Sequence, residues 1–190
     1  IHPLNPNIPT VHMNYRFFEI KNKTESIWWI GGGSDLTPYF LIEEDCIHFH
    51  KTLQHACNTI DKTLYPEFKK KCDTYFFLPH RNEHRGIGGI FFDYIHKYPF
   101  EKAFNLAKNC ANAFLPSYLP LVDNHKNTPF SQEDQEWQYY RRGRYVEFNL
   151  IHDKGTLFGF KTKGRTKSIL MSLPKHASWH YDEEKLTKKH

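Results

Sequence analysis

The sequence lacks the cysteine spacing of a zinc site and the long apolar run of a membrane helix. Its 190 residues include four cysteines, Cys46, Cys57, Cys72 and Cys110, and no two of them form a Cys-x-x-Cys motif. Isolated cysteines of this kind are typical of buried thiols in a reducing compartment rather than of disulfides. No apolar run approaches the length needed to cross a bilayer, and no secretory signal peptide is recognisable. We therefore expect no membrane span.

The chain also lacks a concentrated positive charge. Lysine and arginine number 26 against 21 aspartates and glutamates, which gives a formal net charge of +5. This excess suits an anionic partner but is modest. A nucleic-acid-binding protein more often gathers its basic residues in one stripe, whereas here they are scattered apart from residues 141–144 and the lysine-rich end. We expect no nucleic-acid partner.

Hydrophobic periodicity predicts an α+β fold. Helices are expected over residues 42–60, over 100–114 and from Ser131 to Gly143, with Pro116 ending the second of them. Strands are expected over residues 11–20, 27–31, 89–92, 144–151, 157–162 and 168–173. Short turns such as Asp153-Lys154-Gly155 join the last three strands and favour antiparallel hairpins. The pattern thus predicts an antiparallel sheet covered by helices, with no repeat and no long linker.

The most informative pattern lies in the first predicted strand. Residues 11–19 alternate with a period of two, which places His12, Asn14 and Arg16 on one face and larger apolar side chains on the other. Neighbours on such a face lie about 7 Å apart. An imidazole, an amide and a guanidinium in one row can move a proton, form hydrogen bonds and bind a carboxylate. On periodicity alone, a solvated strand face without a function is the simpler interpretation.

A glycine-rich segment follows this strand. Gly31-Gly32-Gly33 lacks the Gly-x-Gly-x-x-Gly or Gly-Lys-Ser/Thr context of a phosphate-binding loop. It is either a tight bend after two tryptophans or a place where missing side chains leave room for a large flat ligand. Asp35, two residues further on, is either a turn residue or a carboxylate beside that ligand.

Several longer blocks have an unusual composition. They are WWIGGGSDLTPYF (28–40), HRNE (80–83), RGIGGIFFD (85–93), RRGRYVEFNL (141–150), GTLFG (155–159) and GRTKSILMSLP (164–174). In this order, and together with residues 11–19, they resemble the oxygen-dependent coproporphyrinogen III oxidases of the haem pathway from His2 to about Tyr181. The resemblance implies the family fold, which is a broad antiparallel sheet sandwiched between helices. Because relatives are longer at both ends, it also implies a single domain over 1–190 that is truncated at its N-terminus, with its C-terminus left open.

The resemblance implies an enzyme. Members of the family convert two propionates of coproporphyrinogen III to vinyl groups and give protoporphyrinogen IX, with O₂ as oxidant and CO₂ and H₂O₂ as products. No flavin or nicotinamide is implied, so the expectation is O₂ as co-substrate and no cofactor. Carried onto this sequence, the resemblance implies His12 as acid/base and Asp35 as the carboxylate that accepts the pyrrole N–H groups. Which of the two moves the proton is left open.

The resemblance implies further contacts around the substrate. The expected residues are Asn14, Tyr15, Arg16, Lys163, Gly164 and Arg165. Many relatives carry glycine or serine where this chain has Lys163, so that contact can differ. A minority interpretation is a metal site, because His2, His12, His50 and His80 match positions proposed as metal ligands in bacterial relatives. Their spacing is not diagnostic.

The resemblance also bears on assembly and location. It implies a homodimer through late strands within residues 145–180. Cysteine usage favours a cytoplasmic location, with the mitochondrial intermembrane space as the alternative. Two other functions stay open at this point, a metal-dependent oxygenase and a non-catalytic tetrapyrrole-binding fragment.

Overall fold

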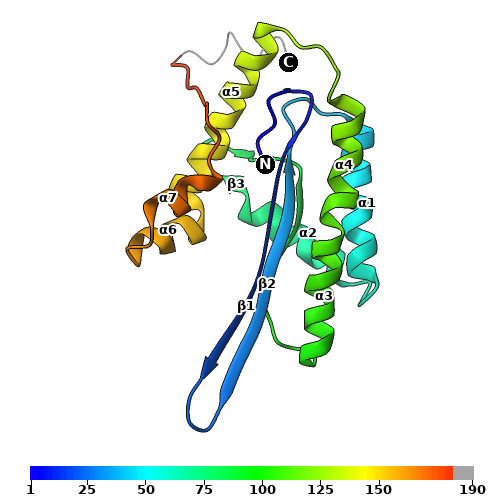
Figure 1. Ribbon diagram of the computed structural model, residues 1–190, viewed down its shortest axis with the longest axis vertical. Coiled ribbons are helices and arrows are strands. Elements are labelled where there is room, and N and C mark those ends of the chain that lie inside the picture. Colours follow the sequence, from blue (N-terminus) through cyan, green and yellow to red (C-terminus); the bar gives the residue numbers. More distant parts are fainter. Residues whose placement is uncertain (182–190) are drawn as a thin grey trace.

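The computed structural model describes residues 1–181 and packs an antiparallel sheet against helices, which confirms the α+β class (Figure 1). In chain order the elements are β1 (Thr10–Lys21), β2 (Ser26–Thr37), α1 (Glu43–Asn58), α2 (Leu64–Tyr75), β3 (Phe77–Leu78), β4 (Glu83–His84), β5 (Gly88–Ile95), α3 (Phe100–Asn112), α4 (Phe114–His125), α5 (Gln132–Glu147), the π-helix η1 (Phe148–His152), α6 (Lys154–Lys161), α7 (Thr166–Ile169) and the 3₁₀-helix η2 (Leu170–Ser172). Among these residues no helix is both long and apolar enough to cross a membrane.

The main sheet has three strands in the order β1-β2-β5, and each strand is antiparallel to its neighbour. β1 and β2 form one long hairpin whose tip extends beyond the helices (Figure 1). The register places His12 opposite Asp35 and Asn14 opposite Gly33. The Gly31-Gly32-Gly33 segment is therefore extended strand and not a tight bend.

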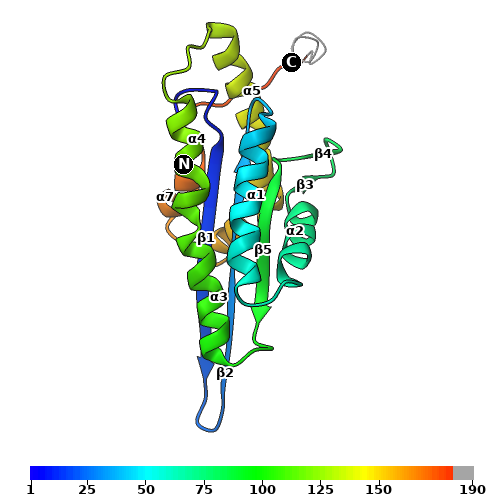
Figure 2. The same cartoon turned by 90° about the vertical axis from the view of Figure 1, so that its right-hand side faces the viewer.

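Three helices cover one face of this sheet. Figure 2 shows α1, α3 and α4 lying over β1 and β2. Phe49 of α1 and Leu106 of α3 form one apolar core with Val11 and Leu36 of the sheet. The face with Val11 is thus held by packing, which leaves the face with His12 pointing away from these helices.

The first two predicted helices correspond to α1 and α3. α3 ends at Asn112, but the chain resumes as α4 two residues later. Pro116 lies in the first turn of α4, where its missing N–H removes no helical hydrogen bond. The proline is therefore compatible with a second helix that the sequence analysis did not predict.

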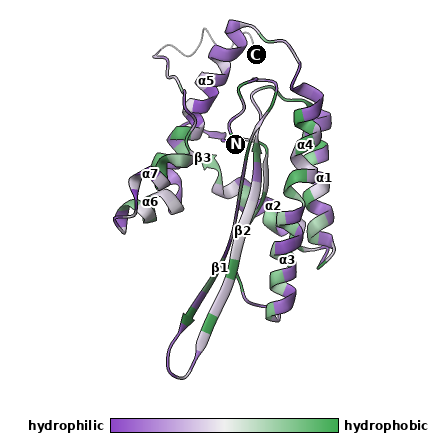
Figure 3. Ribbon diagram, in the orientation of Figure 1, coloured by the Kyte–Doolittle hydropathy of each residue, from purple (hydrophilic) through white to green (hydrophobic). Residues whose placement is uncertain are grey.

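α5 begins where its N-terminal signal predicted. Ser131 and Asp134 form a reciprocal capping box, in which the Ser131 N–H donates to Asp134 Oδ2 at 2.7 Å. The helix does not close at Gly143 but continues to Glu147. Figure 3 shows that much of α5 is hydrophilic, and its buried positions include Gln138 and Arg142. Polar contacts therefore hold much of this helix in place.

The late strands expected over residues 144–151, 157–162 and 168–173 are wrong, because this region is helical. Asp153, which was interpreted as part of a hairpin turn, is the N-cap of α6 and accepts a hydrogen bond from Thr156 N at 2.7 Å. Tyr140, Arg144 and Phe148 are buried at four-residue spacing, which is a helical period. The capping signals and this period outweighed the apolar and aromatic content that suggested strands.

Candidate functional site

The three strands bring polar side chains together on the face that points away from α1, α3 and α4. His12 Nδ1 lies 2.8 Å from Asp35 Oδ1. Arg16 Nη1 donates to Asn14 Oδ1 at 3.1 Å, and Arg16 Nη2 forms an ion pair with Asp93 Oδ2 at 3.1 Å. The row predicted on β1 is thus connected to β2 and to β5.

Asp35 is buried and paired with a buried arginine. The Asp35 and Arg85 side chains are 4% and 2% exposed, and Arg85 Nη2 donates to Asp35 Oδ2. Burial alone would raise the pKa of Asp35, but the Arg85 guanidinium and the hydrogen bond from His12 lower this pKa below its ordinary value. Asp35 is therefore a carboxylate at neutral pH.

The charge on Asp35 determines the tautomer of His12. A carboxylate only accepts hydrogen bonds, so Nδ1 of His12 carries the proton that lies between the two groups. The neutral imidazole then has its lone pair on Nε2. The His12 side chain is 39% exposed, so the ring remains open to a ligand on this face.

A band of glycines lies beside the polar row. Strand alternation places Gly31 and Gly33 on the same face as Asp35. A Cβ added to Gly31 would come within 2.6 Å of Asp93 Oδ1, and one added to Gly33 within 2.5 Å of the Ile90 carbonyl oxygen. Both glycines are buried: the Asp93 and Arg16 side chains lie over Gly31, and the Ile90 carbonyl lies beside Gly33, so the absence of a Cβ lets these groups approach the strand.

Arg85 is a site residue to which the sequence analysis assigned no role. Its guanidinium carbon lies 3.9 Å from the ring centroid of Phe76 and 4.3 Å from that of Tyr145. Its Nη1 donates to Asn149 Oδ1 at 3.2 Å. Contact with aromatic faces offsets part of the cost of burying the cation. In the sequence Arg85 follows the polar residues 81–84 and precedes a glycine-rich apolar segment, and no local pattern distinguishes it from Arg81.

The structure does not bring Tyr15 to this face. Its ring packs against the apolar core, and its hydroxyl lies 2.8 Å from Ser34 Oγ. Burial raises the pKa of Tyr15 above its ordinary value, so the phenol stays protonated. Tyr15 therefore supports the sheet from the side opposite His12.

Lys163, Gly164 and Arg165 connect α6 to α7. Gly164 N donates to Gly159 O at 2.8 Å, and Lys163 has a positive φ of 56°, so the loop terminates α6. All three residues are exposed. Figure 1 shows the loop at the outer end of α6 and α7, apart from the β1–β2 hairpin.

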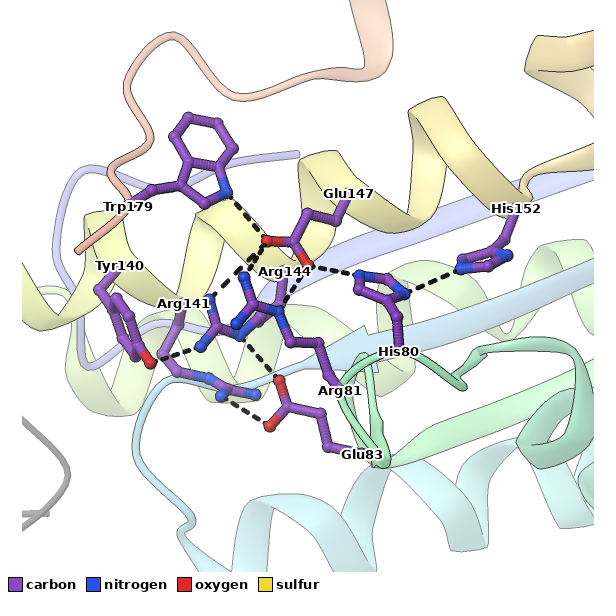
Figure 4. Close-up of polar contacts among 9 residues, drawn as sticks. All are labelled: His80, Arg81, Glu83, Tyr140, Arg141, Arg144, Glu147, His152 and Trp179. Atoms are coloured by element: carbon purple, nitrogen blue, oxygen red, sulfur yellow. Dashed lines mark hydrogen bonds and ion pairs between the residues drawn. The ribbon is translucent and has the colours of Figure 1, made fainter. Parts of the chain in front are cut away.

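The four histidines of the metal interpretation have separate partners. His2 Nε2 lies 2.8 Å from Ser172 O, whereas His50 Nε2 lies 3.1 Å from Ile87 O. His80 Nε2 lies 2.8 Å from Glu147 Oε2, in the network of Figure 4. Within residues 1–181 no group of three or more histidine, cysteine or acidic side chains has the arrangement of a metal site.

The sequence matches one family of known proteins over nearly its whole length. The family model described as Coproporphyrinogen III oxidase matches residues 1–189. An oxygen-dependent coproporphyrinogen-III oxidase of Drosophila melanogaster is 59% identical over 186 residues, which cover 97% of this chain and 48% of that protein.

Relatives of the same description occur in bacteria and plants. One from Francisella tularensis subsp. holarctica (strain OSU18) is 53% identical over 183 residues, which are 96% of this chain and 59% of the relative. A chloroplastic one from Hordeum vulgare is 51% identical over 189 residues, with 97% and 48% covered. The chain thus spans about half the length of the curated relatives that it matches.

Proposed function

We propose that this chain, which belongs to the coproporphyrinogen III oxidase family, carries the residues that convert two propionates of coproporphyrinogen III to vinyl groups. The product would be protoporphyrinogen IX, in haem biosynthesis. The observation that carries the proposal is the linked set of His12, Asp35 and Arg85 on one face of the sheet. Proton transfer needs an oriented base, and the contact with Asp35 orients His12.

The stoichiometry limits what the protein must supply. Each –CH₂–CH₂–COO⁻ arm, with one O₂ and one proton, gives –CH=CH₂, CO₂ and H₂O₂. The electron-rich pyrrole passes on the two electrons that O₂ accepts, so the chain needs to orient the ring, move protons and neutralise carboxylates. These tasks are catalysis by positioning and electrostatics.

We assign the proton transfer to His12 and its orientation to Asp35. Nε2 of His12 takes a proton from a pyrrole nitrogen, while Asp35 fixes the tautomer and stabilises the imidazolium that forms. Both Asp35 oxygens already accept one hydrogen bond, and each keeps a further lone pair for a pyrrole N–H. Arg16 and Asn14 lie on the same face, where a guanidinium suits a propionate.

The proposal is tested by oxygen consumption and porphyrin fluorescence with coproporphyrinogen III. His12→Ala should lower turnover by about 10²- to 10⁴-fold and change binding much less, because general acid–base catalysis contributes to this extent. His48→Ala is the matched control, since His48 lies on α1 and contacts the Pro116 carbonyl on the other side of the sheet.

Two results would contradict the proposal. If His12→Ala lost binding but kept its turnover, the acid/base assignment would be wrong. If the unmodified chain bound the tetrapyrrole and consumed no O₂, non-catalytic tetrapyrrole binding would be the better description.

The proposal includes O₂ as co-substrate and no cofactor. Chelation and dialysis should then leave turnover unchanged. A metal that binds in stoichiometric amount, whose removal abolishes turnover and whose return restores it, would favour the metal-dependent oxygenase instead. The separate partners of His2, His50 and His80 support the metal-free reaction.

A homodimer is also part of the proposal, although the strands first expected to form it are helices. Exposed apolar side chains gather on this helical region, among them Ile151 of η1 and Phe158 of α6, at 54% and 68% exposure. Apolar side chains grouped in this way favour association. Phe158→Glu should reduce the dimer in light scattering, whereas Leu41→Glu, before α1 and 79% exposed, should not. A monomeric unmodified chain would contradict the dimer.

We further propose a cytoplasmic location, with the mitochondrial intermembrane space as the alternative. All four cysteines are free, and Cys57 Sγ and Cys110 Sγ lie 3.9 Å apart without a bond. Free thiols this close are typical of a reducing compartment. Cell fractionation would decide between the two locations.

A further inference from the structure

A cavity of about 540 Å³ opens at the β5 edge of the sheet. Residues of α2, β5, η1 and α6 line it. One of them, Phe91, lies opposite Gly33 in the register of β5 and β2. Strand alternation places Phe91 on the same face as Asp93, which pairs with Arg16. Phe91 therefore belongs both to the cavity and to the face that carries the candidate site.

Two stacked aromatic rings form one side of the cavity. The Tyr75 and Phe91 centroids lie 4.5 Å apart, and their planes differ by 9°. The Tyr75 hydroxyl donates to Asp153 Oδ1 at 2.8 Å and accepts from Lys154 N at 3.1 Å. These bonds fix the ring at the N-terminus of α6, so the aromatic side is rigid and suits the methylene groups of a ligand.

The other lining residues make the cavity cationic. Lys70 and Lys71 of α2 and Lys154 of α6 line it, together with one carboxylate, Glu67. Glu67 already pairs with Lys71 at 2.7 Å and with Lys97 at 3.7 Å. Within residues 1–181, neither Lys70 nor Lys154 takes part in an ion pair of the protein. Two ammonium groups thus remain for an anionic ligand.

A chain of hydrogen bonds holds the histidine in the cavity wall. His152 Nε2 lies 3.1 Å from His80 Nδ1, and His80 Nε2 lies 2.8 Å from Glu147 Oε2 (Figure 4). Burial would raise the pKa of Glu147, but hydrogen bonds from Arg81, His80 and Trp179 lower this pKa to about 2. Glu147 is therefore ionised and accepts a hydrogen bond from His80, whose other ring nitrogen contacts His152. The orientation of the His152 ring is fixed by these bonds.

We propose that this cavity is a carboxylate subsite, in which Lys70 and Lys154 bind one propionate of a tetrapyrrole whose ring lies against the face that carries His12 and Arg16. The inference rests on the proposed function and extends it. An ammonium group binds a carboxylate as a compact point charge, and the stacked aromatic side receives the methylene arm. The subsite would hold the ring in one rotational position relative to His12.

The test measures binding of oxidised coproporphyrin III, which has four propionates and does not react, by fluorescence titration at fixed ionic strength. Lys70→Gln and Lys154→Gln should each raise its Kd by about 3- to 10-fold, and the double variant by more than 10-fold. Lys154→Arg should retain most of the affinity. Lys108→Gln, an exposed charge on α3 on the other side of the sheet, is the matched control.

The tetramethyl ester of coproporphyrin III separates charge recognition from packing. Its affinity should not change in the lysine variants, because it has no carboxylate. Equal losses for acid and ester, or no loss for the acid, would overturn the subsite.

The subsite and the proposed function fail in different ways. If the unmodified chain turns over coproporphyrinogen III and the lysine variants bind coproporphyrin III normally, only the subsite is wrong. If the lysine variants lose acid binding in a chain that consumes no O₂, the subsite holds and the oxidase reaction is wrong. If coproporphyrin III does not bind to the unmodified chain but coproporphyrinogen III is turned over, the subsite is wrong and the oxidase reaction holds; if neither occurs, both are wrong.

Discussion

Removal of the Arg85 guanidinium tests the central electrostatic feature of the site. Arg85→Met keeps a long unbranched side chain among the aromatic rings of Phe76 and Tyr145 but removes the charge that pairs with Asp35. The carboxylate then stays in a buried position with only His12 as a partner. The pKa of Asp35 should rise, because burial is then opposed by one hydrogen bond instead of by a full cation.

The expected cost follows from the burial of both groups. Their side chains are 2% and 4% exposed, so the pair belongs to the class of buried ion pairs. Breaking such a pair by removing one partner costs about 3–5 kcal/mol, because the other charge is left uncompensated. Asp35→Asn should cost a similar amount for the same reason. The Arg85→Met/Asp35→Asn double variant leaves neither charge, so its loss should fall short of the sum by about 2 kcal/mol or more.

Urea unfolding of the four proteins at pH 7 measures this coupling. The difference in unfolding free energy between Arg85→Met and the unmodified chain should also become smaller in acid. Protonation of Asp35 removes the uncompensated buried charge of the variant, whereas in the unmodified chain it removes the stabilising ion pair as the pH falls below the ordinary pKa of an aspartate. A loss below about 1 kcal/mol for Arg85→Met, or single losses that simply add in the double variant, would refute the reasoning. If the single variants do not fold, a folded double variant would still show the coupling.

Two further predictions concern α5. Glu147 has a folded-state pKa of about 2 against an ordinary value of 4.5, so its stabilising contribution is present above pH 4.5 and is lost as the pH falls towards 2. Glu147→Gln should therefore be less stable than the unmodified chain at neutral pH, and the unfolding free energies of the two proteins should converge in acid. A difference in unfolding free energy that does not vary with pH would contradict the assignment. Ser131→Ala should lower the unfolding free energy, measured with urea, by about 1 kcal/mol through loss of the capping box. Ser131→Asp should leave the unfolding free energy nearly unchanged. Equal losses in both variants would show that the cap does not stabilise the helix.

The sequence predicted those parts of the structure that have a clear period. The alternation in residues 11–19 is confirmed as β1, and the stripes over residues 42–60 and 100–114 are confirmed as α1 and α3. In the two helices this apolar face packs against the core, whereas on β1 Val11 is buried but Met13 and Phe17 are 44% and 49% exposed. The cap at Ser131 was readable for a different reason, since a reciprocal pair of side chains is a local signal.

Other elements were hidden because their signals are short or mixed. α2 buries Leu64, Phe68 and Cys72 at four-residue spacing, but the lysines between them conceal the stripe. In the late region, Asp153 supports either a turn or a helix cap, and aromatic residues favour strands locally. Packing of Phe148 in the core, together with the cap at Asp153, decides for the helix.

The site itself depends on contacts between residues far apart in the chain. His12 and Asp35 became a pair once the register of β1 and β2 was known, because they lie opposite each other in the hairpin. Arg85 comes from the segment before β5, and no local pattern assigns it to Asp35. Which nitrogen of His12 is free for chemistry follows only from this three-residue arrangement.

The same period of two that exposes the site also stabilises it. On β2, Gly33 and Asp35 face the site, whereas Ser34 and Leu36 between and beside them face the core. Glycines weaken a strand, because they lose more backbone entropy on folding and provide no side chain to pack. Here β2 is paired on both edges, and its opposite face is held by the core and by the hydrogen bond between Ser34 and Tyr15. A slip of one residue in the register would bury the face with the candidate site and expose the core, so the packing that determines the fold also keeps the site in place.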